Sequence, residues 1–238
     1  RPRDWSSDVC SSDLQLAEAS RGLVLVVGMA LPAEFQHSGA VLRPAVNAAV
    51  VFADGVQVAV VRKRLLPTYD VFDEDRYFQP GTVAGVVDVC GRRLGIAICE
   101  DIWSHVDDGQ PRYDLDPVAE LVAAGADCIV NLSASPFDLG KAARRLKLVH
   151  EIASRHRVPI AYCNLVGGND ALIFDGRSFA LDGAGRLLVV GPAFASADVR
   201  VELPHRREQE VAPLEVPTSF APPFADEARA ALVLGLRD

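Results

Sequence analysis

The stretch VAGVVDVCGRRLGIAICEDIW, residues 83–103, contains a hairpin pattern, which decides the fold together with the helix–strand pattern that follows it. Its two apolar runs flank Cys90 and Gly91, which suit a tight turn, and so predict a hairpin of antiparallel strands. Downstream, residues 117–126 predict a short helix, and the apolar run DCIVNLS (127–133) predicts another buried strand. Hairpins mixed with helix–strand pairs predict an α/β domain with a mixed sheet and helices outside it.

The flanking sequence adds elements of the same kinds. Upstream, the apolar run GLVLVVGM (22–29) predicts a strand buried on both faces, and residues 46–62 predict a hairpin that turns at Asp54 and Gly55. Downstream, apolar residues recur at helical spacing over residues 140–156, which predicts an amphipathic helix. The remaining expected strands cover residues 159–164, 178–182, 186–190 and 198–203.

The composition is that of an ordinary globular domain. Of the 238 residues, 50% are hydrophobic and 24% are charged, so the chain can bury a full core. A net charge of -8 and a pI of about 5.1 argue against binding to nucleic acid or to an anionic membrane. The apolar runs are shorter than the roughly 20 residues that a membrane helix needs. The cysteines are odd in number and irregularly spaced, which is typical of reduced thiols, and we expect a cytoplasmic protein.

The two ends of the chain differ from its middle. Residues 1–14, RPRDWSSDVCSSDL, repeat an SSD triplet and have neither helical nor strand periodicity, and we interpret them as non-native, adapter-like sequence. Residues 15–215 form the predicted domain. Residues 216–224 are a Pro-rich linker, and residues 225–238 have a helical pattern that we interpret as the start of a further, truncated domain.

Cys99 is the first candidate for chemistry. It ends the apolar run LGIAIC and is followed at once by two acidic residues. A thiol at a strand end can face a pocket with backbone N–H groups behind it, which suits a nucleophile whose oxyanion must be held. The alternative is a small core residue, which is the commoner role of a cysteine in a strand and our interpretation of Cys90, Cys128 and Cys163.

Four further polar residues lie where ligand-binding groups are found. Lys63 ends a predicted strand and can stabilise an oxyanion as a point charge, and Glu74 falls in the loop VFDEDRYFQPG (71–81). Ser135 and Lys141 follow a predicted buried strand, where α/β proteins bind ligands. Structural alternatives remain: a solvated strand edge for Lys63, a loop acid for Glu74 and a helix cap for Ser135.

Several common catalytic signatures are absent from the sequence. It contains no P-loop, no Gly-rich dinucleotide fingerprint, no GxSxG elbow and no HExxH motif. The histidines lack metal-ligand spacing with the cysteines, so no metal site is predicted. A Cys–His hydrolase is unsupported, although His105 lies near the Cys99 loop.

Four motifs together resemble the carbon–nitrogen hydrolase, or nitrilase, superfamily, and more narrowly the glutaminase domain of glutamine-dependent NAD synthetases. They are RKRLLPTYDVFDEDRYFQPG (62–81), LGIAICEDIW (94–103), NLSASPFDLGK (131–141) and NLVGGNDALIFDGRSFALD (164–182). The resemblance spans about residues 20–238, and RAALVLGLRD (229–238) is similar to the entry into the synthetase domain. It implies a nitrilase-like α-β-β-α sandwich of mixed sheets with outer helix layers, truncated at the N-terminus.

The resemblance also implies a role for each candidate. The family uses a Glu–Lys–Cys triad with a second glutamate in support. Cys99 matches the nucleophile, Lys63 the triad lysine and Glu74 the supporting glutamate. By the same similarity, the residues that line the glutamine site are Tyr69, Glu100, Ser135 and Lys141.

One part of the family pattern matches no residue of this sequence. The triad glutamate, which is the general base, belongs to a segment upstream of the first predicted strand. The nearby acids Glu18, Glu34 and Asp54 do not stand in its setting. We therefore expect that segment to be missing and the chain by itself to lack useful glutaminase activity. If a base lies within the chain after all, Glu34, Glu100 and His105 are the alternatives.

The expected function is hydrolysis of the glutamine amide, which supplies ammonia to an ATP-dependent amidation of deamido-NAD. The resemblance implies no cofactor for this domain, and ATP and Mg for the synthetase domain. Expected partners are glutamine, the synthetase domain of the same polypeptide and further copies in a homo-oligomer, without nucleic acid or membrane. The alternatives are a stand-alone amidase, which the linker at 216–224 argues against, and a non-catalytic module, which the retention of Cys99, Lys63 and Glu74 argues against.

Overall fold

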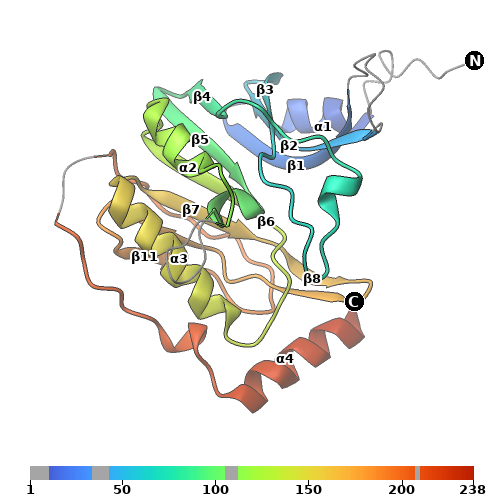
Figure 1. The fold of residues 1–238 in the computed structure, drawn as a ribbon, viewed down its shortest axis with the longest axis vertical. Helices are drawn as coiled ribbons and strands as arrows, with labels where there is room; N and C mark the ends of the chain where they lie inside the picture. Colours follow the sequence, from blue (N-terminus) through green and yellow to red (C-terminus); the bar gives the residue numbers. More distant parts are fainter. Residues whose placement is uncertain (1–10, 34–42, 105–111, 207–209) are drawn as a thin grey trace, which may run out of the picture.

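The computed structural model describes residues 11–33, 43–104, 112–206 and 210–238 (Figure 1). Its elements in chain order are α1 (Ser11–Ala19), β1 (Val24–Pro32), β2 (Ala45–Ala53), β3 (Val56–Arg62), η1 (Glu74–Arg76), β4 (Val86–Val89), β5 (Arg92–Ile98), η2 (Cys99–Ile102), α2 (Pro117–Ala123), β6 (Cys128–Ser133), α3 (Lys141–His156), β7 (Ile160–Asn164), β8 (Val166–Asn169), β9 (Leu172–Asp175), β10 (Phe179–Leu181), β11 (Leu187–Val190), η3 (Thr218–Phe220) and α4 (Phe224–Arg237).

Strands of the described residues form a mixed six-stranded sheet and an antiparallel three-stranded sheet. The larger sheet has the order β11-β10-β7-β6-β5-β4, in which β5, β6 and β7 run parallel and the other pairs are antiparallel. The smaller sheet has the order β1-β2-β3. A separate hairpin, β8-β9, follows β7. This mixture is the α/β arrangement that the sequence predicts.

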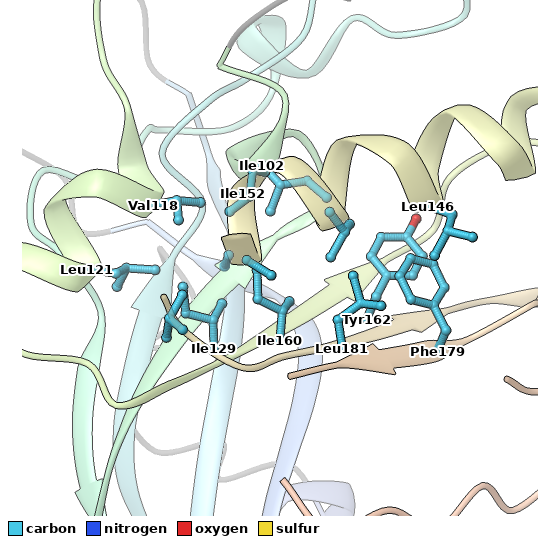
Figure 2. Close-up of a cluster of buried hydrophobic side chains, with 14 of the residues drawn as sticks. Ile102, Val118, Leu121, Ile129, Leu146, Ile152, Ile160, Tyr162, Phe179 and Leu181 are labelled. Carbon is cyan, nitrogen blue, oxygen red and sulfur yellow. The ribbon is translucent and has the colours of Figure 1, made fainter. Parts of the chain in front are cut away.

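The layers follow the order helix, sheet, sheet, helix. Helices α2 and α3 cover one face of the six-stranded sheet, and Figure 2 shows their side chains, such as Leu121 and Leu146, packed against Ile129 and Ile160 of the strands. The opposite face meets the three-stranded sheet through a second apolar cluster that contains Val51 and Ile98. Helix α1 packs against β2 and β3. The predicted α-β-β-α sandwich is confirmed.

Helices α2 and α3 form for reasons visible in the sequence. Asp116 caps α2, because its carboxylate accepts the N–H of Ala119 at 3.0 Å, and Pro117 occupies the first turn, where its missing N–H costs nothing. In α3 the residues at helical spacing are the buried ones: Ala142, Leu146, Val149 and Ala153.

Four local features differ from the expectations. Strand β1 is an edge strand with Gly28, Ala30 and Pro32 exposed, rather than a strand buried on both faces, because an apolar run does not reveal its place in a sheet. Residues 198–203 form no strand; Arg92 donates instead to the carbonyls of Leu203 and Pro204.

The other two differences are additional structure. The hairpin β8-β9 was not predicted, since its glycines weaken the strand pattern. Helix α1 begins at Ser11, within the range 1–14 that has no clear periodicity.

Helix α4 lies against the β8-β9 hairpin at the lower edge of the molecule in Figure 1. It buries Glu227, Ala231 and Leu234 on the inner side and leaves Leu232 and Leu236 exposed on the outer side. Within the described parts of the chain, every helix is too short or too polar to cross a membrane.

Candidate active site

Cys99 stands at the carboxyl end of β5, one of the three parallel strands, where the chain turns into η2. Its φ is +45°, in the left-handed region that a residue with a Cβ rarely adopts. Such strain is found at sites where the surrounding structure fixes one side chain for function. The turn directs Cys99 to a cavity of about 1240 Å³ that it lines together with Lys63 and Glu74. A cavity of this size is large enough for a small organic substrate.

Lys63 and Glu74 form an ion pair inside this cavity. Lys63 follows β3 and has only 1% of its side chain exposed, and its Nζ lies 2.6 Å from Glu74 Oε1. The amide of Asn47, on β2, donates to the other carboxylate oxygen at 3.3 Å. Because both oxygens of Glu74 are held, the carboxylate fixes the position of the lysine. The sequence did not single out Asn47.

Three charges act on the Cys99 thiol. Burial raises its pKa above the ordinary value, the nearby Lys63 ammonium lowers it, and the carboxylates of Glu100 and Glu74 raise it further. Burial is the largest of these effects, so the resting thiol is protonated at neutral pH. A base is therefore needed to generate the thiolate during reaction.

Glu100, the next residue, is held in a cluster of its own. Its Oε1 accepts the hydroxyls of Tyr69 at 2.7 Å and Tyr113 at 2.9 Å, and the Arg112 guanidinium lies 3.6 Å away. Arg112 also donates to the Tyr69 hydroxyl at 2.6 Å and stacks over its ring. Burial and the hydrogen bond to Glu100 raise the pKa of Tyr69. The cluster fixes the position of a buried carboxylate beside the nucleophile.

Ser135 and Lys141 lie beyond the ends of the parallel strands. The Ser135 N–H donates to Asn164 Oδ1 at 3.0 Å, which buries Ser135 and fixes its loop. Lys141 opens α3, and burial together with Arg145 lowers the pKa of its ammonium, while Cys99 acts in the opposite direction. Lys141 is therefore close enough to the nucleophile for its ammonium to interact with a Cys99 thiolate.

Asp101 connects the Cys99 turn to the strand end that carries Lys63. Its carboxylate accepts the N–H groups of Arg64 at 3.0 Å, Leu65 at 2.8 Å and Ile98 at 3.0 Å. The segments before Cys99 and after Lys63 are thus bound to one side chain. No sequence pattern indicates this role beyond the acidic residue itself.

The structure therefore brings Cys99, Lys63 and Glu74 together at one cavity. Tyr69 and Glu100 form a cluster that adjoins it, and Ser135 and Lys141 lie beyond it across the sheet end rather than on its wall. Sequence reasoning missed Asn47, Arg112, Tyr113 and Asn164 because they become neighbours only in the fold. His105 and Glu34 lie outside the described residues. Within the described ranges no His, Cys, Asp and Glu group could hold a metal ion.

The carbon–nitrogen hydrolase family profile matches residues 12–204, most of the chain. The chain belongs to the carbon–nitrogen hydrolase family. This hydrolase is 43% identical over 149 residues to a glutamine-dependent NAD(+) synthetase of Synechocystis sp., a match that covers 62% of this chain and 27% of the relative. It thus spans about a quarter of that relative's length.

Solved structures agree with the assignment. A glutamine-dependent NAD+ synthetase from Acinetobacter baumannii, in complex with ADP, matches this hydrolase with a TM-score of 0.72 and 32% identity over 94% of this chain and 39% of that chain. An amidase from Nesterenkonia sp. AN1 matches with a TM-score of 0.61 and 22% identity over 76% of this chain and 62% of the amidase, which supports the fold alone.

Proposed function

We propose that this carbon–nitrogen hydrolase cleaves the side-chain amide of glutamine, with Cys99 as the nucleophile. The observation that carries the proposal is the Cys99 turn, which faces a cavity shared with the buried Lys63–Glu74 pair. The names of the relatives, which are glutamine-dependent NAD(+) synthetases, support glutamine as the amide.

The chemistry begins with the thiol proton passing to a carboxylate base, which the family resemblance assigns to a glutamate that matches no residue of this sequence. The thiolate of Cys99 then attacks the amide carbon, and the negative charge moves to the amide oxygen. Lys63 stabilises that oxyanion as a fixed positive charge, and Glu74 holds Lys63 in place. The carbon–nitrogen bond breaks as the base returns the proton to the leaving nitrogen, so ammonia departs. Water then hydrolyses the thioester to glutamate and free thiol.

The Tyr69–Glu100 cluster and the Ser135–Lys141 segment suit the two charges of an amino-acid substrate. Glu100 is a buried carboxylate that pairs with an ammonium group, and Tyr69 orients it through a 2.7 Å hydrogen bond. Lys141 is a cation for the α-carboxylate, and the family resemblance assigns Ser135 to the same site. Simultaneous recognition of both charges would favour a free amino acid over a simple amide such as acetamide.

The wider role that we propose is nitrogen supply to NAD synthesis, with ammonia from this site used in an ATP- and Mg-dependent amidation by a synthetase domain of the same polypeptide. The support is the relatives' names and the share of their length that this chain covers. A cytoplasmic location, for which the odd number of cysteines is the support, and a homo-oligomeric state belong to the same proposal.

Protection of Cys99 from alkylation tests the substrate without requiring turnover. L-Glutamine should slow the modification of Cys99 by iodoacetamide while leaving Cys90, which is exposed and does not line the cavity, unaffected. Peptide mass spectrometry measures both sites in one sample. Equal protection by acetamide would favour a stand-alone amidase, and no protection by either compound would contradict the proposal.

A further inference from the structure

Four charged side chains are buried together behind the cavity. They are Arg145 on α3, Asp175 at the end of β9, Arg177 just after it and Glu227 on α4, and each is at most 5% exposed. Asp175 accepts Arg145 Nη2 at 2.7 Å and Arg177 Nη1 at 2.8 Å, and Arg177 Nη1 lies 2.9 Å from Glu227 Oε1. Two positive and two negative groups thus form one continuous, balanced chain from α3 to α4.

Stability alone is a weak reason for such a network. Burying an ion pair costs desolvation free energy that its Coulomb attraction barely offsets, and apolar side chains of similar volume would serve packing as well. The hydrogen-bonded pairs of Asp175 with Arg145 and Arg177 instead fix the geometry of the groups that they join, since planar guanidinium groups bind carboxylates in few orientations. Glu227 adds its charge to Arg177 at 2.9 Å without a hydrogen bond.

One end of the network holds the Ser135 loop. The Arg145 guanidinium donates to the Ser135 carbonyl at 3.5 Å. The Ser135 N–H donates to Asn164, whose own amide donates to the carbonyl of Gly176 at 3.0 Å, between the two charged residues of the turn. Both polar groups of the Ser135 backbone are therefore connected to the network.

The other end depends on the C-terminal segment. Arg177 has a φ of +55°, a strained conformation for a residue with a Cβ, and it lines the cavity. Its Nε donates to the Ser219 carbonyl at 3.0 Å, and Glu227 supplies the second contact. The position of this part of the cavity wall therefore depends on residues 218–227.

We propose that Glu227 is a positioning residue, through which the packing of α4 sets the affinity of the cavity for its amide substrate. The network transmits the position of α4 to Arg177 and the Ser135 loop, and it leaves the turn that carries Cys99 unchanged. This inference rests on the proposed function, since the Ser135 loop is assigned there to the glutamine site.

The test compares two electrophiles on the whole chain, carrying Glu227→Gln. Diazo-oxo-L-norleucine, a glutamine analogue, must be bound before it reacts, so its inactivation kinetics separate the binding constant KI from the rate constant kinact. Iodoacetamide reports the reactivity of the Cys99 thiol alone. We expect KI to rise roughly 3- to 30-fold, with kinact and the iodoacetamide rate unchanged. Glu227→Asp should restore most of the affinity.

Asp226→Asn is the matched control, because it removes the same charge from the adjacent, exposed position of α4. It should change KI by less than about 2-fold. Unchanged KI in Glu227→Gln, or equal loss of KI, kinact and iodoacetamide reactivity, would overturn the positioning role while leaving the proposed function intact. If neither the unaltered chain nor a version preceded by the upstream segment of the Acinetobacter baumannii synthetase shows saturable labelling of Cys99, both proposals fall together. Arg177→Lys keeps the positive charge but lacks the planar guanidinium group, and it provides a second variant with the same expected rise in KI.

Discussion

The Asp101 carboxylate has no ion-pair partner among its hydrogen-bond donors, which are three backbone N–H groups. Burial is the largest influence on it and raises the pKa of Asp101 from 3.8 to about 6, against the opposing effect of those donors and of Lys63. The group that holds the Cys99 turn to the Lys63 strand therefore titrates in the mildly acidic range.

The raised pKa of Asp101 makes the free energy of unfolding depend on pH, and comparison with Asp101→Asn measures that dependence. The folded state binds the proton more tightly than the unfolded state, so the contribution of Asp101 to the free energy of unfolding falls as pH rises from about 4 to about 6. Two pKa units correspond to a fall of ~3 kcal/mol. Urea unfolding of both proteins across this range should show the difference between them shrinking by that order. Parallel pH profiles for the two proteins would show that Asp101 keeps an ordinary pKa.

At the scale of elements, the loop between Lys63 and Gly81 returns the chain to the end of β3. The Gly81 N–H donates to the Lys63 carbonyl at 2.7 Å, and the loop places Glu74 beside the lysine side chain on the way. A Cβ at Gly81 would lie 2.5 Å from the Arg62 carbonyl oxygen, which leaves no room for any other residue.

Gly81→Ala should therefore lower the free energy of unfolding by ~1–3 kcal/mol, because the loop must move away from β3. Alkylation of Cys99 at neutral pH should also slow, since a displaced Lys63 lowers the thiol pKa less. Gly28→Ala is the control for stability, because a methyl group there meets nothing within 4 Å. Equal thermal stability of the two variants would show that the loop adapts without strain.

Among these elements, the sequence predicts the hairpins but not the contacts between distant loops. The hairpins at Asp54–Gly55 and Cys90–Gly91 were predictable because each turn contains a glycine between two apolar runs. In the structure all four turn residues adopt the positive φ that such turns require. The Glu100 cluster was not predictable, since Arg112 lies in a loop without periodicity and contacts Tyr69, which is distant in sequence, only in the folded protein. Local pattern identifies strands and turns, whereas partners distant in sequence depend on packing.

At the scale of the whole molecule, the cavity requires both sheets. Asn47 and Lys63 come from the three-stranded sheet, and Cys99 and Asn164 come from the six-stranded sheet. Cys99 itself was predictable from its place at a strand end. The pairing of Lys63 with Glu74 came from the family resemblance, because no local pattern reveals how the sheets stack.

The catalytic base gives a prediction at this scale. Ammonia release from glutamine by this chain as written should be at least ~100-fold slower than by a version preceded by the corresponding upstream segment of the Acinetobacter baumannii synthetase. The reason is that no group in the described residues matches the triad glutamate. Similar turnover by the two proteins would show that a base lies within these residues, with Glu100 the first to replace by glutamine.

Site-specific labelling by diazo-oxo-L-norleucine tests the roles of Cys99 and of the glutamine site together, because the reagent requires both the amino-acid site and the nucleophile. The Cys99 sulfur should form a thioether with loss of dinitrogen, detected by peptide mass spectrometry, and glutamine should compete. Cys90 and Cys163 are exposed, and burial raises the pKa of Cys128 to about 11, so accessibility alone would favour other sites than Cys99. We expect modification of Cys99 alone among these four cysteines, and its loss in Cys99→Ala. Labelling spread over Cys90 and Cys163, or unaffected by glutamine, would contradict it.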